Sequence, residues 1–350
     1  MALLNHSPLF PPVFSLIWYH GDMNKPTKQP KKKKTAGKKK YKVRNWKEYN
    51  QALVNRGKVL FWITEEAMQK WEEEQKTGKR GKPKTFSNIA IETSLTLSQV
   101  FHMPLRQTEG FLASILEKLA LTLKAPDHST VSIRSKALTV QIRIRPVRKK
   151  SLHIVVDSTG TKVYGEGEWK VRQHGWSRRR TWKKLHIGVD EKTGDILIGE
   201  VTGNDAADCQ MVAPLIRQLP DDTMIDQFSG DGAYDRRMCY DALKERSVPR
   251  ITIPPQHNAR IWRHGNSKDE RYARDENVRR IRHIGRKQWK IESGYHRRSL
   301  SENTMFRLKT IFGERISARL FENQRTQLLI RCKALNRMTM LGMPESYIVA

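Results

Sequence analysis

The chain has 350 residues, with 66 Lys and Arg against 36 Asp and Glu, so its formal net charge is +30. This length allows two or three domains, and the excess of positive charge predicts a polyanionic partner such as nucleic acid. Apolar residues make up 37% of the chain, which excludes a wholly disordered protein.

The three cysteines, Cys209, Cys239 and Cys332, are odd in number and far apart. This pattern excludes a disulfide scaffold and a zinc site built on a CxxC motif. We therefore expect a protein of the reducing cytoplasm.

Residues 1–40 are predicted to be a disordered leader followed by a basic arm. Segment 3–19 is apolar, but prolines interrupt it and it is too short to cross a bilayer. No Lys or Arg precedes Lys25, although a signal peptide needs a basic start. Residues 1–22 are therefore interpreted as a disordered leader or as sequence upstream of a start at Met23. Residues 25–47 are rich in Lys and Arg without any acid, and this arm either neutralises DNA phosphates or is a solubilising tail.

Residues 41–138 are predicted to form a helical DNA-binding domain. Short helices are expected at 45–57 and 64–75, with a linker at 78–84. Residues 87–138 carry apolar stripes with helical spacing, divided by Pro104.

The last helix of this region mixes small polar and basic residues, and Asp127 or Ser129 is expected to cap it. Three short helices of this kind suit a helix-turn-helix fold, and an ordinary helical packing domain is the alternative. The candidate DNA-binding residues are Thr130, Ser132, Arg134 and Lys136.

Residues 140–341 are predicted to form an RNase H-like domain with C-terminal helices. Strands are expected at 152–156, 184–190, 196–202, 224–229 and 250–253, helices at 205–219 and 234–246, and long helical patterns over 274–341 with breaks near Gly285 and Gly313. This is the element order of an RNase H-like mixed α/β sheet, in which the first strands pair antiparallel and later strands enter through right-handed crossovers.

Two aspartates follow apolar strands in this region. Asp157 closes the predicted strand in IVVDSTG, and Asp231 lies between glycines in FSGDGAY. Each side chain is expected to project from the end of the sheet, where a ligand can approach. The alternative for each is an ordinary turn or cap aspartate, and Asp231 in particular can cap a helix that begins at Ala233.

A third acid, Glu302, lies in a predicted C-terminal helix. Tyr295, Arg298, Glu302 and Lys309 fall within one narrow stripe of a continuous helix, at about 100° per residue. A solvated Arg298–Glu302 ion pair is the alternative interpretation. Glu292 is a competing acid if the register differs.

The three acids are candidate ligands for Mg²⁺ or Mn²⁺ and candidate catalytic residues. These ions prefer carboxylate oxygens, and two of them about 4 Å apart can act on both oxygens of a phosphoryl displacement. We therefore expect two ions at Asp157, Asp231 and Glu302, with neighbouring Lys and Arg on the nucleic-acid backbone and Tyr295 stacked on a base or sugar.

The spacing of Tyr295, Arg298, Glu302 and Lys309 resembles the YREK signature of bacterial insertion-sequence transposases. The contexts of Asp157 and Asp231 are similar to those of the first two aspartates of that family, and the segments YKVRNWKEYN and LRQTEGFL resemble the insertion-sequence-five family in particular. The resemblance runs from Tyr41 to the C-terminus. It implies that Asp157, Asp231 and Glu302 form the DDE triad of an RNase H-like core, and that Tyr295, Arg298 and Lys309 contact DNA near the transposon end.

The function implied by this resemblance is DNA transposition. Residues 87–138 would recognise terminal inverted repeats, metal-activated water would cut one strand, and the released 3′-hydroxyl would attack target DNA directly. Holding two DNA ends implies a homodimer or larger assembly close to the bacterial nucleoid, and no membrane partner is expected. Two alternatives stay open: a catalytically silent transposase-derived repressor, and an RNase H-like nuclease that does not depend on the repeats.

Overall fold

The computed structural model describes residues 40–73, 83–147, 151–163, 182–264 and 271–349, and the chain divides into two compact units. One unit combines residues 1–42 with 346–350. Its described residues belong to a two-stranded sheet of β1 (Lys40–Val43) and β8 (Ser346–Val349). The other unit, Val43–Glu345, contains every other element. The predicted leader and most of the arm lie outside the described residues, as does most of the 78–84 linker.

The first part of the larger unit is helical, as predicted. Its elements are α1 (Trp46–Arg56), α2 (Val59–Trp62), α3 (Glu65–Gln69), α4 (Asn88–Val100), α5 (Leu105–Lys118), α6 (His128–Arg134) and the 3₁₀ turn η1 (Ser135–Ala137). Two helix starts follow from capping chemistry, because a side-chain oxygen satisfies an unpaired backbone N–H at each. Thr64 accepts from the Ala67 N–H, and Asp127 accepts from the Thr130 N–H.

The second part contains a mixed sheet with the order β4-β3-β2-β5-β6. Its strands are β2 (Leu152–Val163), β3 (Trp182–Asp190), β4 (Ile196–Thr202), β5 (Ile225–Ser229) and β6 (Arg250–Thr252). The pairs β2–β3 and β3–β4 are antiparallel, whereas β5 runs parallel to β2 and β6 runs parallel to β5. A short β7 (Arg315–Ile316) pairs with the far end of β2. This mixed α/β sheet agrees with the predicted RNase H-like order.

The remaining helices flank this sheet. The short η2 (Asp208–Met211), α8 (Val212–Ile216), η3 (Gly232–Tyr234) and α9 (Arg237–Glu245) precede α10 (Ala273–Ile284), α11 (Arg286–Glu292), η4 (Tyr295–Arg298), α12 (Ser299–Phe312) and α13 (Phe321–Leu341). Among the described residues, no helix has the length and apolar character needed to cross a membrane.

Two sequence-based boundaries in this part are wrong. Strand β2 does not end at Asp157 but continues to Val163, because residues 158–162 pair with β3 from His186 back to Trp182. The helix expected at 205–219 is reduced to η2 and α8, which begin only at Asp208 and end at Ile216. Local signals were misleading in the first case, since the Ser-Thr-Gly after Asp157 looks like a turn until a partner strand pairs with it.

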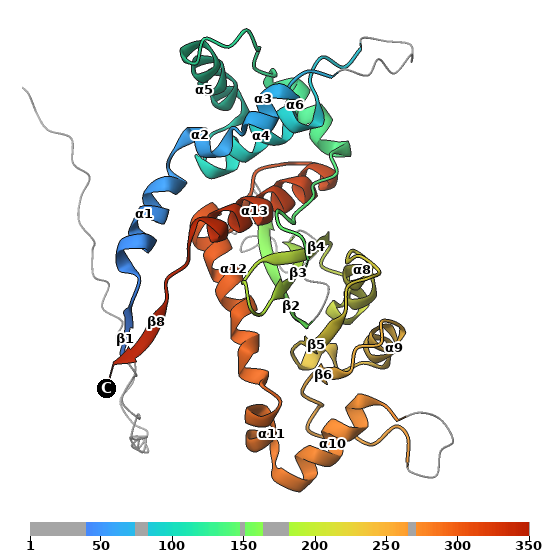
Figure 1. Cartoon of the computed structure of the whole chain (residues 1–350). Helices are drawn as coiled ribbons and strands as arrows, with labels where there is room; N and C mark the ends of the chain where they lie inside the picture. Colours follow the sequence, from blue (N-terminus) through green and yellow to red (C-terminus); the bar gives the residue numbers. More distant parts are fainter. Residues whose placement is uncertain (1–39, 74–82, 148–150, 164–181, 265–270, 350) are drawn as a thin grey trace, which may run out of the picture. The chain divides into compact units, whose positions relative to one another are not determined.

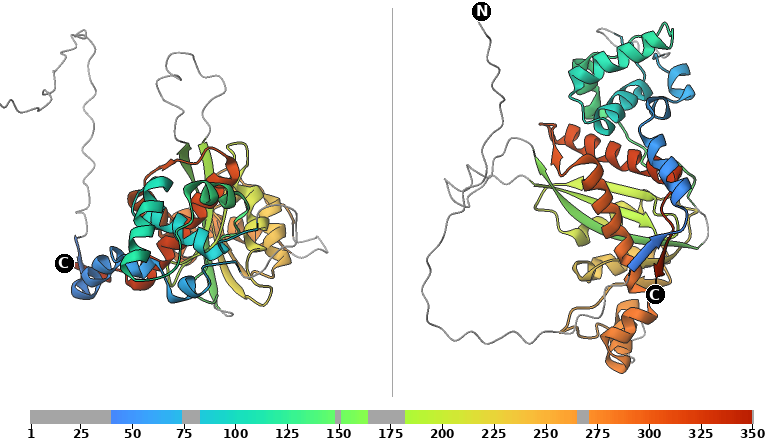
Figure 2. Two further views of the ribbon diagram at one scale, coloured as in Figure 1. Left: turned by 90° about the horizontal axis from the view of Figure 1, so that it is seen from above. Right: turned by 90° about the vertical axis from the view of Figure 1, so that its left-hand side faces the viewer.

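Hydrophobic residues pack on both faces of the sheet. On one face, Leu152, Ile154 and Val156 of β2 join the residues of α8 and α9. On the other, Leu185 and Ile187 of β3 pack with α12, α13 and the N-terminal helices. Figure 1 shows α13 between those helices and the sheet, and the right-hand view of Figure 2 shows α12 and α13 against one face of the strands.

The side chain of Asn336 on α13 connects this layer to the sheet. Its Oδ1 accepts from the Ile196 N–H, and its Nδ2 donates to the Ile196 and Ile142 carbonyls. The N-terminal helices and the sheet therefore share one core across the predicted 138/140 boundary. Separate folding of residues 41–138 stays a prediction.

Candidate active site

Asp157 lies in the middle of β2, on the face covered by α12 and α13. It is directly opposite Ile187 of β3, and residues opposite one another point to the same face of a sheet. Its Oδ1 accepts from the Ser158 N–H at 2.9 Å, and its Oδ2 accepts from Arg298 Nη1 at 3.2 Å and Ser301 Oγ at 3.3 Å. Burial raises the pKa of the Asp157 carboxyl despite the Ser158 hydrogen bond and the Arg298 charge, and the nearby charge of Asp231 also raises it.

Arg298 connects Asp157 to Glu302. One Nη of its guanidinium donates to Asp157, and the other donates to Glu302 in the first turn of α12. These two acids are far apart in sequence, but they share one cation in the folded chain. Burial lowers the pKa of Arg298, but Tyr295, Asp157 and Glu302 around it raise that pKa overall.

Asp231 follows the strand next to β2. In the parallel β2–β5 pair, Val155 is opposite Ser229, so Asp157 and Asp231 each lie two residues beyond a matched pair. Asp231 Oδ1 accepts from the Ala233 N–H at 2.8 Å and caps η3. Asp231 therefore does cap a helix, as the alternative interpretation predicted. The cap uses only Oδ1, and Oδ2 takes no part in it.

The expected continuous helix through Tyr295 and Lys309 is wrong. Gly294 has a φ of 66°, and the 3₁₀ turn η4 separates α11 from α12. Only Glu302 and Lys309 share α12. The left-handed backbone at Gly294, which a residue without Cβ adopts easily, lies before Tyr295 and separates η4 from α11, whereas η4 leads directly into α12.

Tyr295 nevertheless lies beside Arg298, whose guanidinium carbon is 5.8 Å from the centre of the ring. Lys290 Nζ is 5.0 Å from the same ring centre. Two cations therefore face this tyrosine. Lys309 is half-buried on α12.

Sequence patterns missed Ser301, and the competing acid Glu292 has a different partner in the structure. Ser301 is fully buried and donates to Asp157, but no periodicity marks a serine beside a glutamate. Glu292 accepts two hydrogen bonds of 3.0 Å from Arg280 in α10. It is occupied in that ion pair rather than placed with Asp157.

Comparison with known protein families identifies the family of this chain. A family model described as "Transposase DDE domain" matches residues 148–337, more than half of the chain, and a second model with the same description matches residues 54–166. The chain belongs to the DDE transposase family. The transposase is therefore a phosphoryl-transfer enzyme, and its membership implies a function in DNA transposition.

DDE transposases generally use divalent metal ions. Among the residues that the structure describes, no group of three His, Cys, Asp or Glu side chains is arranged to hold a metal ion. Asp157 and Glu302 instead surround one positive group, the Arg298 guanidinium. Their oxygens are the donors that Mg²⁺ and Mn²⁺ prefer. The carboxylate oxygens at this site are thus of the kind that binds a divalent ion. In this structure the Arg298 guanidinium lies between two of the acids, Asp157 and Glu302.

The four candidate DNA-binding residues of the α6 region differ in whether their side chains are hydrogen-bonded within the protein. Thr130 Oγ1 donates to Asp127 at 2.6 Å, and Arg134 donates to the Phe86 carbonyl at 2.5 Å and to Asn88 at 2.6 Å. Ser132 lines a cavity, and Lys136 is exposed. Two of the four side chains are therefore held by contacts within the transposase.

Proposed function

We propose that this transposase binds the terminal inverted repeats of an insertion sequence and catalyses strand cleavage followed by strand transfer. Asp157, Asp231 and Glu302 are the proposed catalytic and metal-binding residues. The observation that supports this assignment best is the shared contact of Asp157 and Glu302 with Arg298, since the Asp157–Arg298 bond joins β2 to η4 across 141 residues of sequence and Arg298 also binds Glu302 of α12. The YREK spacing supports the finer assignment to transposases resembling the insertion-sequence-five family.

The proposed reaction has two phosphoryl transfers. In the first, water attacks a phosphodiester at the transposon end, the bond to the 3′ oxygen breaks, and a 3′-hydroxyl and a 5′-phosphate result. In the second, that 3′-hydroxyl attacks a target phosphodiester, joins the transposon end to the target and releases the target's own 3′-hydroxyl. When bound, a divalent ion supplies the positive charge that activates the attacking oxygen and stabilises the leaving oxygen.

The transposase's own side chains position these groups. Ser301 and the Ser158 N–H hold the Asp157 carboxylate on the face toward α12. Arg298 and Lys309 carry positive charge for phosphates of the transposon end, and Tyr295 offers an aromatic ring on which a base or sugar can stack. In the helical region we propose that Thr130, Ser132, Arg134 and Lys136 help to recognise the repeat, with Thr130 and Arg134 acting through the position of α6.

A synaptic complex of two or more copies follows from the need to hold two DNA ends. The basic character of the chain suits this partner, because each phosphate neutralised by Lys or Arg releases bound counterions and strengthens association.

The decisive experiment is a cleavage assay on labelled duplexes that carry the ends of the element encoding this chain, with Mg²⁺, Mn²⁺ or EDTA. We expect metal-dependent nicking at the end and strand transfer. The variants Asp157→Asn, Asp231→Asn and Glu302→Gln should each reduce the rate by on the order of a thousandfold or more while binding is retained, because each removes a charged ligand of the ions. Glu292→Gln is the matched control, because that acid is bound to Arg280, and it should keep nearly full activity.

Two other outcomes would replace the proposal. Repeat-specific binding without cleavage under any metal would indicate a repressor. Cleavage of RNA–DNA hybrids without regard to the repeat would indicate an RNase H-like nuclease.

A further inference from the structure

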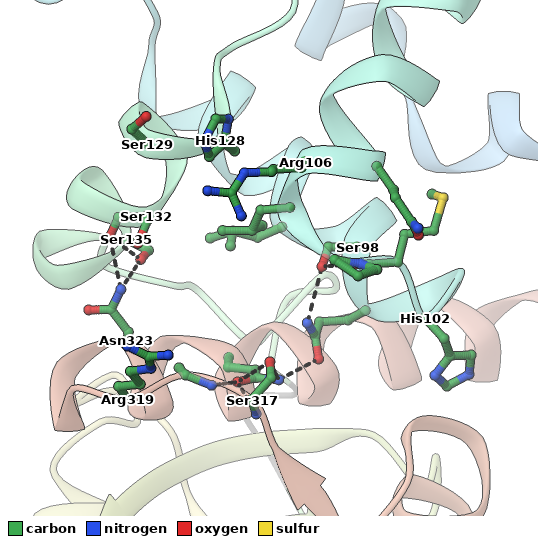
Figure 3. Close-up of a pocket in the computed structure, with 18 of the residues that line it drawn as sticks. Ser98, His102, Arg106, His128, Ser129, Ser132, Ser135, Ser317, Arg319 and Asn323 are labelled. Atoms are coloured by element: carbon green, nitrogen blue, oxygen red, sulfur yellow. Dashed lines mark hydrogen bonds between the residues drawn. The ribbon is translucent and has the colours of Figure 1, made fainter. Parts of the chain in front are cut away.

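A cavity of about 1140 Å³ opens between the N-terminal helices and α13. Its walls come from the end of α4, the start of α5, α6 with η1, and residues 317–320 with the first turns of α13. We call it the α5–α13 pocket. Figure 3 shows Arg106 reaching into it from α5, with Ser132 and Ser135 on one side and Arg319 and Asn323 below. It shares no residue with the acid site around Asp157.

As far as the chain is described, the lining of the α5–α13 pocket is positive and contains no carboxylate. The ionisable residues that line it are Arg106, Arg319, Arg331, His102 and His128. Two acids beside the lining already have partners, and for one of them the partner is the lining residue His128. Glu109 Oε2 accepts from the His128 N–H and lies 2.8 Å from His128 Nδ1, and Asp127 caps α6.

Two of these arginines are exposed and uncommitted. Arg106 and Arg319 are solvent-accessible, and over the described ranges of the chain neither guanidinium has a hydrogen bond or ion pair. Arg106 lies in the first turn of α5. The backbone N–H groups of that turn have no acceptor within the helix and add to the positive potential.

The third arginine, Arg331, is buried, and none of the acids that the structure describes forms an ion pair with it. Arg331 is 4% exposed, and its guanidinium donates to Gln99 Oε1 and to the carbonyls of Gly313 and Arg315. All three acceptors are neutral, and burial lowers the pKa of Arg331 to about 10. A buried charge that has hydrogen bonds but no ion partner remains electrostatically costly, and an anion in the adjoining space would offset that cost.

The rest of the lining is a mixture of apolar groups such as Leu105 and Leu320 with serine hydroxyls. A DNA backbone offers the complement to both features, since its phosphates are anionic and its deoxyribose faces are largely apolar.

We propose that the α5–α13 pocket binds the phosphodiester backbone of DNA, with Arg106 and Arg319 in contact with phosphates and Arg331 behind them. This inference rests on the proposed function in that DNA is the ligand, but it concerns binding rather than chemistry. The contact would hold DNA at the junction of the helical region and α13, independently of its base sequence.

The test compares charge reversals by fluorescence anisotropy with labelled duplexes over a range of salt concentrations. Arg106→Glu and Arg319→Glu should each weaken binding by on the order of tenfold, equally for repeat and non-repeat duplexes, and Arg106→Ala should reduce the slope of log affinity against log salt by about 1. Arg106→Lys should keep the slope. Arg217→Glu is the matched control, at an exposed arginine directly after α8 on the other face of the sheet, and it should change affinity little.

Two results would overturn the proposal. One is unchanged affinity and salt slope in the folded Arg106→Glu/Arg319→Glu double variant. The other is an equal loss in Arg217→Glu, which would indicate a general effect of net charge. A competition arm with inorganic phosphate separates DNA from a small anion: phosphate that stabilises the wild type against heat, while the variants still bind DNA normally, would assign the pocket to free phosphate.

The cleavage assay keeps this inference separate from the proposed function. Normal metal-dependent cleavage together with unchanged DNA affinity in the double variant would contradict only the proposal that the pocket binds DNA. If the wild type never cleaves DNA but the double variant loses affinity, the proposal for the pocket is supported and the proposed cleavage reaction is contradicted.

Discussion

The acid site and the α5–α13 pocket use the same residue type in opposite ways. At the acid site, Arg298 is held between the carboxylates of Asp157 and Glu302. In the pocket, Arg106 and Arg319 face open space, and Arg331 is surrounded by neutral acceptors. A formal charge of +30 therefore says little about any single arginine until its neighbours are known.

This difference separates two roles for positive charge. An arginine bound to two carboxylates must exchange partners before it can hold a phosphate, so its net attraction for DNA is reduced. An arginine without a carboxylate partner keeps its full attraction and makes binding sensitive to salt. We therefore expect affinity for DNA to depend more on the pocket, and catalysis to depend more on the acid site.

The largest expected effect within this comparison is on stability. Arg331→Leu removes three hydrogen bonds that a buried guanidinium donates to half-buried Gln99 and to the carbonyls of the exposed residues Gly313 and Arg315, and each such bond contributes about 0.5–1.5 kcal/mol. We expect a loss of about 3 kcal/mol in the free energy of unfolding, measured by urea denaturation. Arg106→Leu, at an exposed position, should change it by less than about 0.5 kcal/mol. Equal stability of the two variants would contradict the buried, hydrogen-bonded placement of Arg331.

A second effect, which appears only below about pH 6.5, concerns the strand that carries Asp157. His153 lies on β2 with Nε2 2.8 Å from Ser229 Oγ, and burial, together with the charges of Arg250 and Arg297, lowers its pKa to about 4. The unfolded chain takes up a proton on this residue near its ordinary pKa, whereas the folded chain does so only near pH 4. Stability should therefore fall as the pH is lowered from about 6.5 towards 4, by at most about 1.4 kcal/mol per pH unit.

The measurement is denaturation of the wild type and of His153→Gln at a series of pH values. The variant should lose this part of the acid destabilisation. The same pH dependence in both proteins would show that His153 is not buried in its neutral form.

The smallest expected effect tests the competition at the acid site. Removing Arg298 leaves Asp157 and Glu302 without their shared cation, so Arg298→Ala should bind Mn²⁺ more tightly in the absence of DNA. Even the small contribution of an ion pair near the surface, about 0.2–1 kcal/mol, corresponds to a gain in Mn²⁺ affinity of roughly 1.4- to fivefold. Titration of Mn²⁺ followed by electron paramagnetic resonance measures this directly.

Arg297→Ala provides the matched control, because Arg297 is paired with Glu191 rather than with the proposed triad. It should leave Mn²⁺ affinity unchanged. Weaker Mn²⁺ binding in Arg298→Ala would mean that Arg298 organises the acids instead of competing for them.

Much of the local structure of this transposase could be predicted from sequence. Apolar strand patterns located β3, β4 and β5 to within two residues, and of the two predicted caps of α6, Asp127 or Ser129, the structure has Asp127. Such signals involve only a few neighbouring residues, so they can be recognised without knowing the tertiary structure. The proposed triad was also found from sequence, because Asp157 and Asp231 follow apolar strands and Glu302 lies in a distinctive spacing.

The sequence by itself thus determined which segments become strands and helices, and which acids are candidates for chemistry, because periodicity and capping are local properties. Only the tertiary structure decided that Arg298 bridges Asp157 and Glu302, that Ser301 donates to Asp157, and that Arg106 and Arg319 line one cavity. Those contacts join residues separated by more than a hundred positions. Their geometry depends on the pairing of β2 with its neighbours and on the packing of α12 and α13 against the sheet, which no short stretch of sequence encodes.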